Sequence, residues 1–98
     1  MRVLVVCNAG MSSSILVKKM KDYAASQGEE LMIKAVSSAA AENEAGEWDV
    51  CLVGPQLMHA VDEIAEAVEV PTEAGDMRTY AMADGEGALK QAKALLEK

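Results

Sequence analysis

Two short runs of consecutive apolar residues, most of them β-branched, constrain the fold of this chain more than any other feature. They occupy residues 3–6 and 50–53. Runs of this kind are typical of strands that are buried on both faces of a parallel sheet. Residues 31–36 alternate loosely between apolar and polar side chains and are interpreted as a further strand. The pattern therefore favours an α/β fold.

The segments that follow these strands have the apolar spacing of helices. A first helix is expected to begin at Ser12 or Ser13, either of which is a natural N-cap, and to end near Gly28. Residues 57–68 predict an amphipathic helix, and a last helix is expected from Asp84 onward. Because strands and helices alternate, the sequence predicts a small doubly wound parallel sheet flanked by helices.

Two segments carry weaker signals. Residues 37–47 are rich in alanine and acidic residues, and they indicate a short helix and a loop. A fourth strand is expected on one side of Pro71, but residues 71–80 are unusually polar for a strand of this sheet. The extent of that strand is not fixed by the pattern.

Length and charge restrict the domain organisation and the partners. The chain has 98 residues, 51% of them apolar, so we expect one domain over residues 1–98. Its net charge is −7, which makes nucleic acid and anionic membranes poor partners. No apolar run approaches the roughly 20 residues that span a bilayer, and the apolar start is too short for the core of a signal peptide. A cytoplasmic protein without direct membrane insertion is expected.

The inventory of reactive side chains is small. Cys7 and Cys51 have no Cys-x-x-Cys spacing, which argues against a disulfide scaffold and a zinc site. His59 is the only histidine, so a nucleophile in this chain would lack a histidine base. Cys51 lies in an apolar run and is interpreted as an inert core thiol, and His59 as a solvated helical residue. No metal or nucleotide cofactor is predicted.

Cys7 is the candidate nucleophile because it ends the first strand and precedes a loop that opens a helix. Ligands of open α/β sheets bind at the carboxyl ends of the strands. The loop N–H groups and the helix N-terminus would hold a tetrahedral oxyanion, and the same field would favour the thiolate. The loop therefore fits a covalent phosphocysteine. Its predicted phosphate-binding residues are Asn8, Ala9, Gly10, Met11, Ser12, Ser13 and Ser14.

Other functions of the same loop stay open at this point. A low-molecular-weight cysteine phosphatase would need an arginine where this chain has Ser13, and an arsenate reductase would need a cysteine pair. A module that only senses anions is a third candidate. The structural alternative is that Cys7 is a small buried residue and that the serines cap a helix. Without the arginine and a carboxylate, a thiophosphate here would be held well and hydrolysed badly, which suits a carrier.

The segment from Cys7 to Ser14, directly after a hydrophobic strand, resembles the active loop of a known family. That family is the enzyme IIB component of the lactose/cellobiose class of the bacterial phosphoenolpyruvate-dependent sugar phosphotransferase system. Residues 52–56 resemble the family's loop after the third strand, and residues 84–90 resemble its entry to the last helix. The Cys-x-Ala-Gly-Met-Ser-x-Ser pattern is closer to the cellobiose and chitobiose members than to the lactose members.

The resemblance implies a four-stranded parallel sheet with a phosphatase-like loop and a phosphocysteine at Cys7. It also implies a phosphohistidine on a IIA protein as donor, and a sugar bound to a IIC membrane permease as acceptor. The chain would be a single IIB-like phosphoryl-carrier domain, found transiently at the inner face of the membrane through IIC. The sugar would be a β-linked disaccharide such as cellobiose or chitobiose. The predicted wall of the pocket consists of Gly54, Pro55 and Gln56.

Overall fold

The computed structural model describes residues 1–7 and 13–97 of the chain. Four strands form one sheet in the order β2-β1-β3-β4, and every neighbouring pair is parallel. The predicted doubly wound four-stranded parallel sheet is confirmed. The strands are β1 (Arg2–Cys7), β2 (Met32–Ser37), β3 (Val50–Val53) and β4 (Thr72–Ala74).

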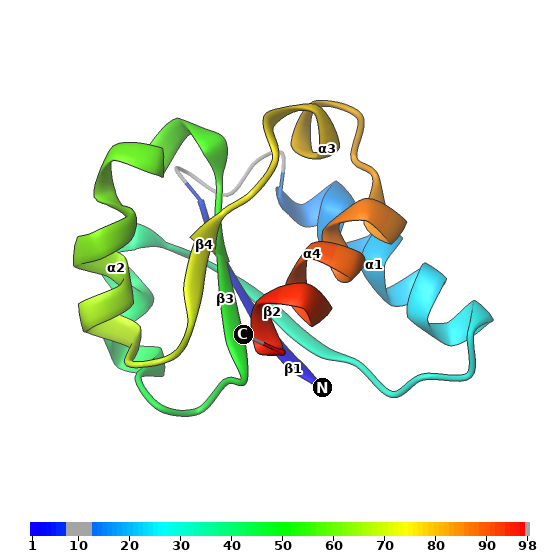
Figure 1. Ribbon diagram of the computed structural model, residues 1–98, viewed down its shortest axis with the longest axis horizontal. Helices are drawn as coiled ribbons and strands as arrows, with labels where there is room; N and C mark the ends of the chain where they lie inside the picture. Colours follow the sequence, from blue (N-terminus) through cyan, green and yellow to red (C-terminus); the bar gives the residue numbers. More distant parts are fainter. Residues whose placement is uncertain (8–12, 98) are drawn as a thin grey trace.

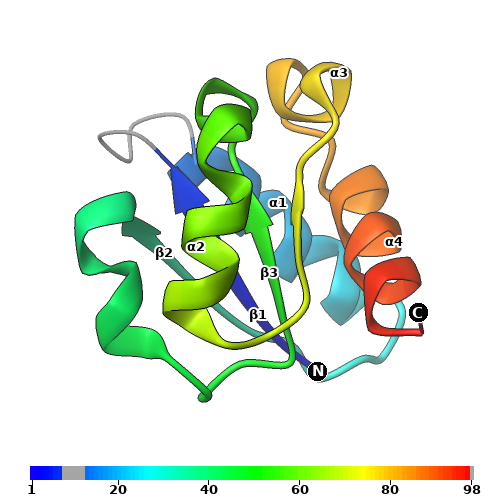
Figure 2. The ribbon, with the colours of Figure 1, turned by 60° about the vertical axis from the view of Figure 1, so that its left-hand side comes forward.

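Helices cover both faces of this sheet, as Figure 1 shows. The helices α1 and α4 lie on one side, and α2 lies on the other with the 3₁₀ helix η1. A further short helix, α3, sits beyond the carboxyl end of the sheet (Figure 2). The elements are α1 (Ser13–Ser26), η1 (Ser38–Glu44), η2 (Pro55–Ala60), α2 (Val61–Val68), α3 (Met77–Ala81) and α4 (Gly85–Leu96).

The two central strands are buried because both of their faces carry a core. Side chains alternate along a strand, so Val3 and Val5 pack towards α1 and α4, while Leu4 and Val6 pack towards α2. The residues of β3 divide in the same way. The unbroken apolar runs at 3–6 and 50–53 follow directly from this two-sided burial.

The edge strands explain the weaker sequence signals. The strand β2 has one neighbour, β1, and four of its six residues are exposed. The strand β4 begins directly after Pro71 and is only three residues long, which settles the extent of the fourth strand. Its polarity has a structural use, because Glu73 Oε1 accepts a hydrogen bond of 2.7 Å from Nε2 of Gln91 on α4. An edge strand with a polar partner does not need an apolar sequence.

The predicted helices are confirmed with two differences. Asp84 caps α4 as expected, because its side chain accepts a hydrogen bond of 3.0 Å from the N–H of Gly87. The segment expected as one helix over 57–68 is divided into η2 and α2, since Ala60, directly before α2, departs from helical geometry with φ of −110° and ψ of 10°. The helix α3 was not predicted, because none of its five residues is fully buried and it therefore leaves no apolar stripe.

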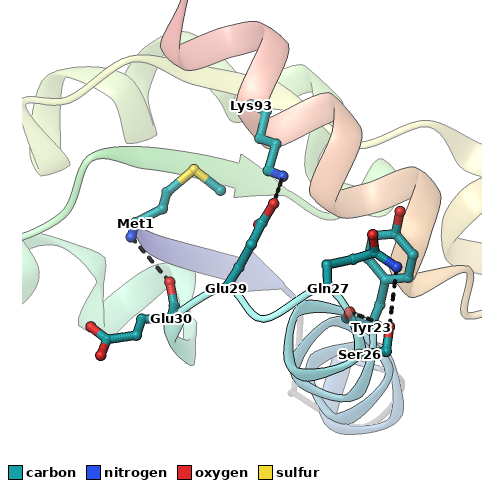
Figure 3. A network of polar contacts seen from close by, with 7 residues as sticks. All are labelled: Met1, Tyr23, Ser26, Gln27, Glu29, Glu30 and Lys93. Atoms are coloured by element: carbon teal, nitrogen blue, oxygen red, sulfur yellow. Dashed lines mark hydrogen bonds and ion pairs between the residues drawn. The ribbon is translucent and has the colours of Figure 1, made fainter.

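Polar contacts tie the loop after α1 to the rest of the molecule at the amino end of the sheet (Figure 3). Lys93 of α4 forms an ion pair with Glu29, and the amino group of Met1 donates to the carbonyl oxygen of Glu30 at 3.3 Å. Gly28, with φ of 70°, turns the chain after α1. These exposed contacts contribute little free energy, and they lie at the end of the molecule opposite Cys7.

Candidate active site at the carboxyl end of the sheet

Cys7 is the last residue of β1, a central strand of the sheet, and only 3% of it is exposed. The strand β1 lies between β2 and β3, so the chain order reverses beside it, and this is where open α/β sheets bind ligands. By the alternation along β1, its side chain faces the α1 and α4 side, as Val3 and Val5 do. The predicted nucleophile therefore stands at the switch point of the sheet.

The described strand and helix flank the predicted phosphate-binding loop. The strand β1 ends at Cys7, and α1 begins at Ser13, so a helix N-terminus follows the cysteine closely along the chain. The side chains of Ser13 and Ser14 are not among those described. The remaining loop residues lie outside the described residues, and their role stays a prediction: Asn8, Ala9, Gly10, Met11 and Ser12.

Gly54 packs directly beside Cys7. Its N–H donates to the carbonyl oxygen of Val6 at 2.7 Å, which continues the β1–β3 ladder past the end of β3. A Cβ added at Gly54 would lie 3.3 Å from Cβ of Cys7 and 2.9 Å from Oε1 of Gln56. The absence of a side chain at position 54 thus leaves room for the Gln56 amide on one side and for Cys7 on the other. Of the three predicted wall residues, Gly54 stands next to Cys7.

Pro55 contributes to a neighbouring pocket at the same end of the sheet. This pocket has a volume of about 390 Å³ and opens between η2 and α3. Pro55 begins η2 and is half-buried. Among the described residues, the pocket is lined by Pro55, Gln56, Met77, Tyr80 and Ala81.

Tyr80 is the site residue that sequence reasoning missed. Its ring covers Gly75, where an added Cβ would lie 2.0 Å from Cε1 of the ring. Burial raises the pKa of Tyr80 well above its ordinary value, and negative charge on Cys7 and then on Cys51 acts in the same direction. The phenol therefore stays protonated close to Cys7. The sequence signal was indirect: a glycine directly follows β3 and another directly follows β4.

Cys51 is fully buried in β3, as predicted, and it faces the α2 side of the sheet. It is paired in register with Leu4, well before the carboxyl end of the strands. Burial raises the pKa of its thiol from 9.0 to about 12, and a hydrogen bond with Thr72 partly offsets this shift. Cys7 faces the opposite side of the sheet, so the geometry does not bring the two thiols together.

Because the thiol of Cys51 is buried, we expect the protein to lose stability at alkaline pH. Below pH 9.0 the thiol of Cys51 is protonated in both states, and between 9.0 and about 12 it ionises in the unfolded chain first. The free energy of unfolding should therefore fall as pH rises through this range, by roughly 3 kcal/mol at pH 11. Urea unfolding at pH 8 and 11 measures the fall. Cys51→Ala should show a smaller fall, and an equal one would contradict the assignment.

His59 is exposed in η2, as predicted, and it lies away from the Tyr80 pocket. It lines a separate pocket of about 430 Å³ between η1 and α2, together with Glu42 and Glu63. Within residues 1–7 and 13–97, no group of three or more His, Cys, Asp and Glu side chains is placed to hold a metal ion. In the same ranges, no helix is long and apolar enough to cross a membrane.

A buried cysteine at the switch point of a small parallel sheet, followed by a helix N-terminus, defines a class of α/β proteins whose candidate site lies at the carboxyl end of the sheet. Comparisons with known proteins identify the family within this class. The family model "PTS system, Lactose/Cellobiose specific IIB subunit" matches residues 2–91. The oligo-β-mannoside-specific EIIB component of Bacillus subtilis is 41% identical over 98 residues, which cover 97% of this chain and 95% of the relative. The cellobiose-specific EIIB component of Lactococcus lactis is 37% identical, covering 96% and 94%.

Solved structures agree with this match. The solution structure of a cellobiose-specific IIB component from Borrelia burgdorferi has a TM-score of 0.81 at 29% identity, covering 99% of this chain and 92% of that one. A lactose-specific IIB domain from Streptococcus pneumoniae has a TM-score of 0.77 at 20% identity, covering 99% and 95%, and it shows the shared fold.

The chain belongs to the lactose/cellobiose IIB family of the sugar phosphotransferase system. The predicted resemblance is therefore confirmed. IIB components are phosphotransferases that carry phosphoryl groups in sugar uptake, and they work with IIA and IIC partners.

Proposed function

We propose that Cys7 is the phosphoryl carrier of this protein. It would accept the phosphoryl group of a phosphohistidine on a IIA protein and pass it to a sugar bound by a IIC permease. The observation that carries the proposal is the position of Cys7, the last residue of a central strand, with the N-terminus of α1 close behind it. Such an arrangement presents a nucleophile and positive potential to one tetrahedral anion.

The chemistry consists of two in-line displacements at phosphorus. In the first, the Cys7 thiolate attacks, the P–S bond forms and the P–N bond breaks, so the imidazole of the donor leaves. In the second, a sugar hydroxyl oxygen attacks, the P–O bond forms, the P–S bond breaks and the thiolate leaves. The hydroxyl proton passes to the acceptor complex or to solvent. The phosphate-binding residues, Asn8 to Ser14 with Gly54 and Gln56, would hold the three equatorial oxygens.

The sugar is proposed to be a β-linked disaccharide or oligosaccharide. The Bacillus subtilis relative is named for oligo-β-mannosides, and the Lactococcus lactis relatives are named for cellobiose and for galactose. Cellobiose and chitobiose are the candidates to test first, and the oligo-β-mannoside name adds a third. The IIC permease would select the sugar among these candidates. In this proposal residues 1–98 act as one cytoplasmic IIB-like domain that meets the membrane only through IIC.

A phosphatase or arsenate reductase is the alternative, and the geometry disfavours it. The loop has Ser13 where a phosphatase of this kind needs an arginine, and Cys51 faces the opposite side of the sheet from Cys7. A reductase would need a second thiol within reach of the first. No observation in the described residues favours hydrolysis or redox turnover over transfer.

The test compares transfer with hydrolysis in one preparation. The purified chain is incubated with phosphoenolpyruvate, the general phosphotransferase proteins and a cognate IIA, and its intact mass is read. A gain of one phosphoryl group supports the carrier. An aryl phosphate is then offered to the chain alone, and turnover would instead support a phosphatase. Reversible phosphate binding without an adduct, from a donor shown to be competent, would indicate an anion sensor.

A further inference from the structure

The hydroxyl of Tyr80 is a buried polar atom without a hydrogen-bond partner among the residues that the structure describes. Burying a hydroxyl away from water without a partner costs free energy, and such groups in folded proteins usually have a reason. The ring of Tyr80 is held in place, because it lies on Gly75 and packs against the core under α1 and α4. Among residues 1–7 and 13–97, the hydroxyl is therefore a fixed donor without an acceptor.

The sheet register brings this hydroxyl to the end where Cys7 lies. Gly54 donates to the carbonyl of Val6, and Gly75 donates to the carbonyl of Val53 at 2.7 Å, so Cys7, Gly54 and Gly75 follow one another across the carboxyl edge. By alternation, all three positions face the α1 and α4 side. The two glycines leave that edge without side chains of its own. The row of Cys7, Gly54 and Gly75 therefore has the cysteine at one end and the ring of Tyr80, which covers Gly75, at the other end.

We propose that Tyr80 donates its hydroxyl hydrogen bond to an oxygen of the phosphoryl group carried by Cys7. The inference rests on the proposed function, because the acceptor is the phosphoryl group that Cys7 would carry. Burial keeps the phenol protonated at any ordinary pH, so that it can donate to an anion.

In this proposal, phosphorylation of Cys7 gives the hydroxyl of Tyr80 a hydrogen-bond acceptor. The bond stabilises the phosphorylated form of the chain. A hydrogen bond to a charged acceptor is about twice as strong as one between neutral groups. Without this bond, phosphoryl exchange between IIA and this chain should shift towards phosphorylated IIA. Unphosphorylated Tyr80→Phe should be as stable as the wild type or more stable, since the substitution removes a buried hydroxyl that has no partner in the described part of the chain.

The experiment measures the exchange equilibrium. Phosphorylated IIA is mixed with wild type, Tyr80→Phe or Tyr23→Phe, and the fraction of each phosphorylated chain is read by intact mass. Tyr23 is the matched control because it is the other tyrosine, lies near the far end of α1, and also packs at the edge of the same core. We expect the equilibrium constant to fall roughly tenfold for Tyr80→Phe. Tyr23→Phe should leave it unchanged.

A second measurement on the wild type keeps the test independent of the variant's folding. With ¹³C-labelled tyrosine, phosphorylation should shift the ring resonances of Tyr80 and leave those of Tyr23 in place. An unchanged exchange equilibrium in folded Tyr80→Phe, or an unmoved Tyr80 resonance, overturns the role of Tyr80 while the phosphocysteine stands. A wild type that takes no phosphoryl group from competent IIA overturns the proposed function itself.

Discussion

Cys7→Ser should abolish phosphorylation of the chain by IIA while leaving the fold intact. A serine hydroxyl at neutral pH is a far weaker nucleophile than a thiolate, and this chain offers no histidine near position 7 to activate it. The substitution is nearly isosteric at a site that is 3% exposed, so the strand and its neighbours should not move. Intact mass after incubation with the donor proteins, beside a thermal melt, reads both effects.

The matched control is Cys51→Ser, which makes the same change at the other cysteine. Cys51 lies on the opposite side of the sheet, so this variant should still gain one phosphoryl group, with some loss of stability from burying a hydroxyl. Phosphorylation of Cys7→Ser at the wild-type rate would remove Cys7 from the chemistry. Loss of phosphorylation in Cys51→Ser alone, with the fold retained, would transfer the role to Cys51.

Gly85→Ala should lower the free energy of unfolding by about 3 kcal/mol, the upper part of the range for overpacked sites. Gly85 begins α4, and an added Cβ would lie 2.3 Å from the carbonyl carbon of Lys19 and 2.6 Å from the nitrogen of Met20. Both atoms belong to the backbone of α1, so no side chain can rotate away. Relief requires α4 to move off α1, which opens the core around Leu89.

Urea unfolding followed by the fluorescence of Trp48, the only tryptophan, measures this loss. Gly46→Ala is the control, because Gly46 has φ of 75° and nothing within 4 Å of the added Cβ. Gly46→Ala strains the backbone without a steric clash and should lower the free energy of unfolding by about 1 kcal/mol. A loss for Gly85→Ala no larger than that for Gly46→Ala would mean that the α1–α4 contact adapts easily.

The parts of the fold that were predictable from the sequence are those whose burial is two-sided or periodic. The strands β1 and β3 are enclosed on both faces, and α4 buries a regular stripe that includes Leu89 and Leu95. The strand β4 gave a weak signal because it is short, lies at an edge and uses Glu73 to bind Gln91. The helix α3 gave none, because it is five residues long, is capped by Asp76 and packs only Tyr80 against the core, which is too little for a periodic apolar pattern.

The candidate site divides in a similar way. Cys7 was predictable because its place depends on local order: a buried strand, a loop rich in serine and a helix. The position of Tyr80 depends on long-range folding, since the segment after β4 must turn back over Gly75 before the ring reaches the edge near Cys7. No spacing in the sequence encodes that return. Gly54 lies between these cases, since its loop was predicted but its contact with Cys7 needs the β1–β3 register.

The central claim, a phosphoryl group on the sulfur of Cys7, is tested most directly by locating the adduct on the phosphorylated protein. Trypsin separates the residues that could carry the phosphoryl group. Residues 3–18 form one peptide, which contains Cys7 and the three loop serines, and residues 35–78 form another, which contains Cys51 and His59. We predict that the added mass lies on the first peptide and that fragmentation assigns it to Cys7. A phosphoryl group on a loop serine, or on the peptide of Cys51 and His59, would contradict the account.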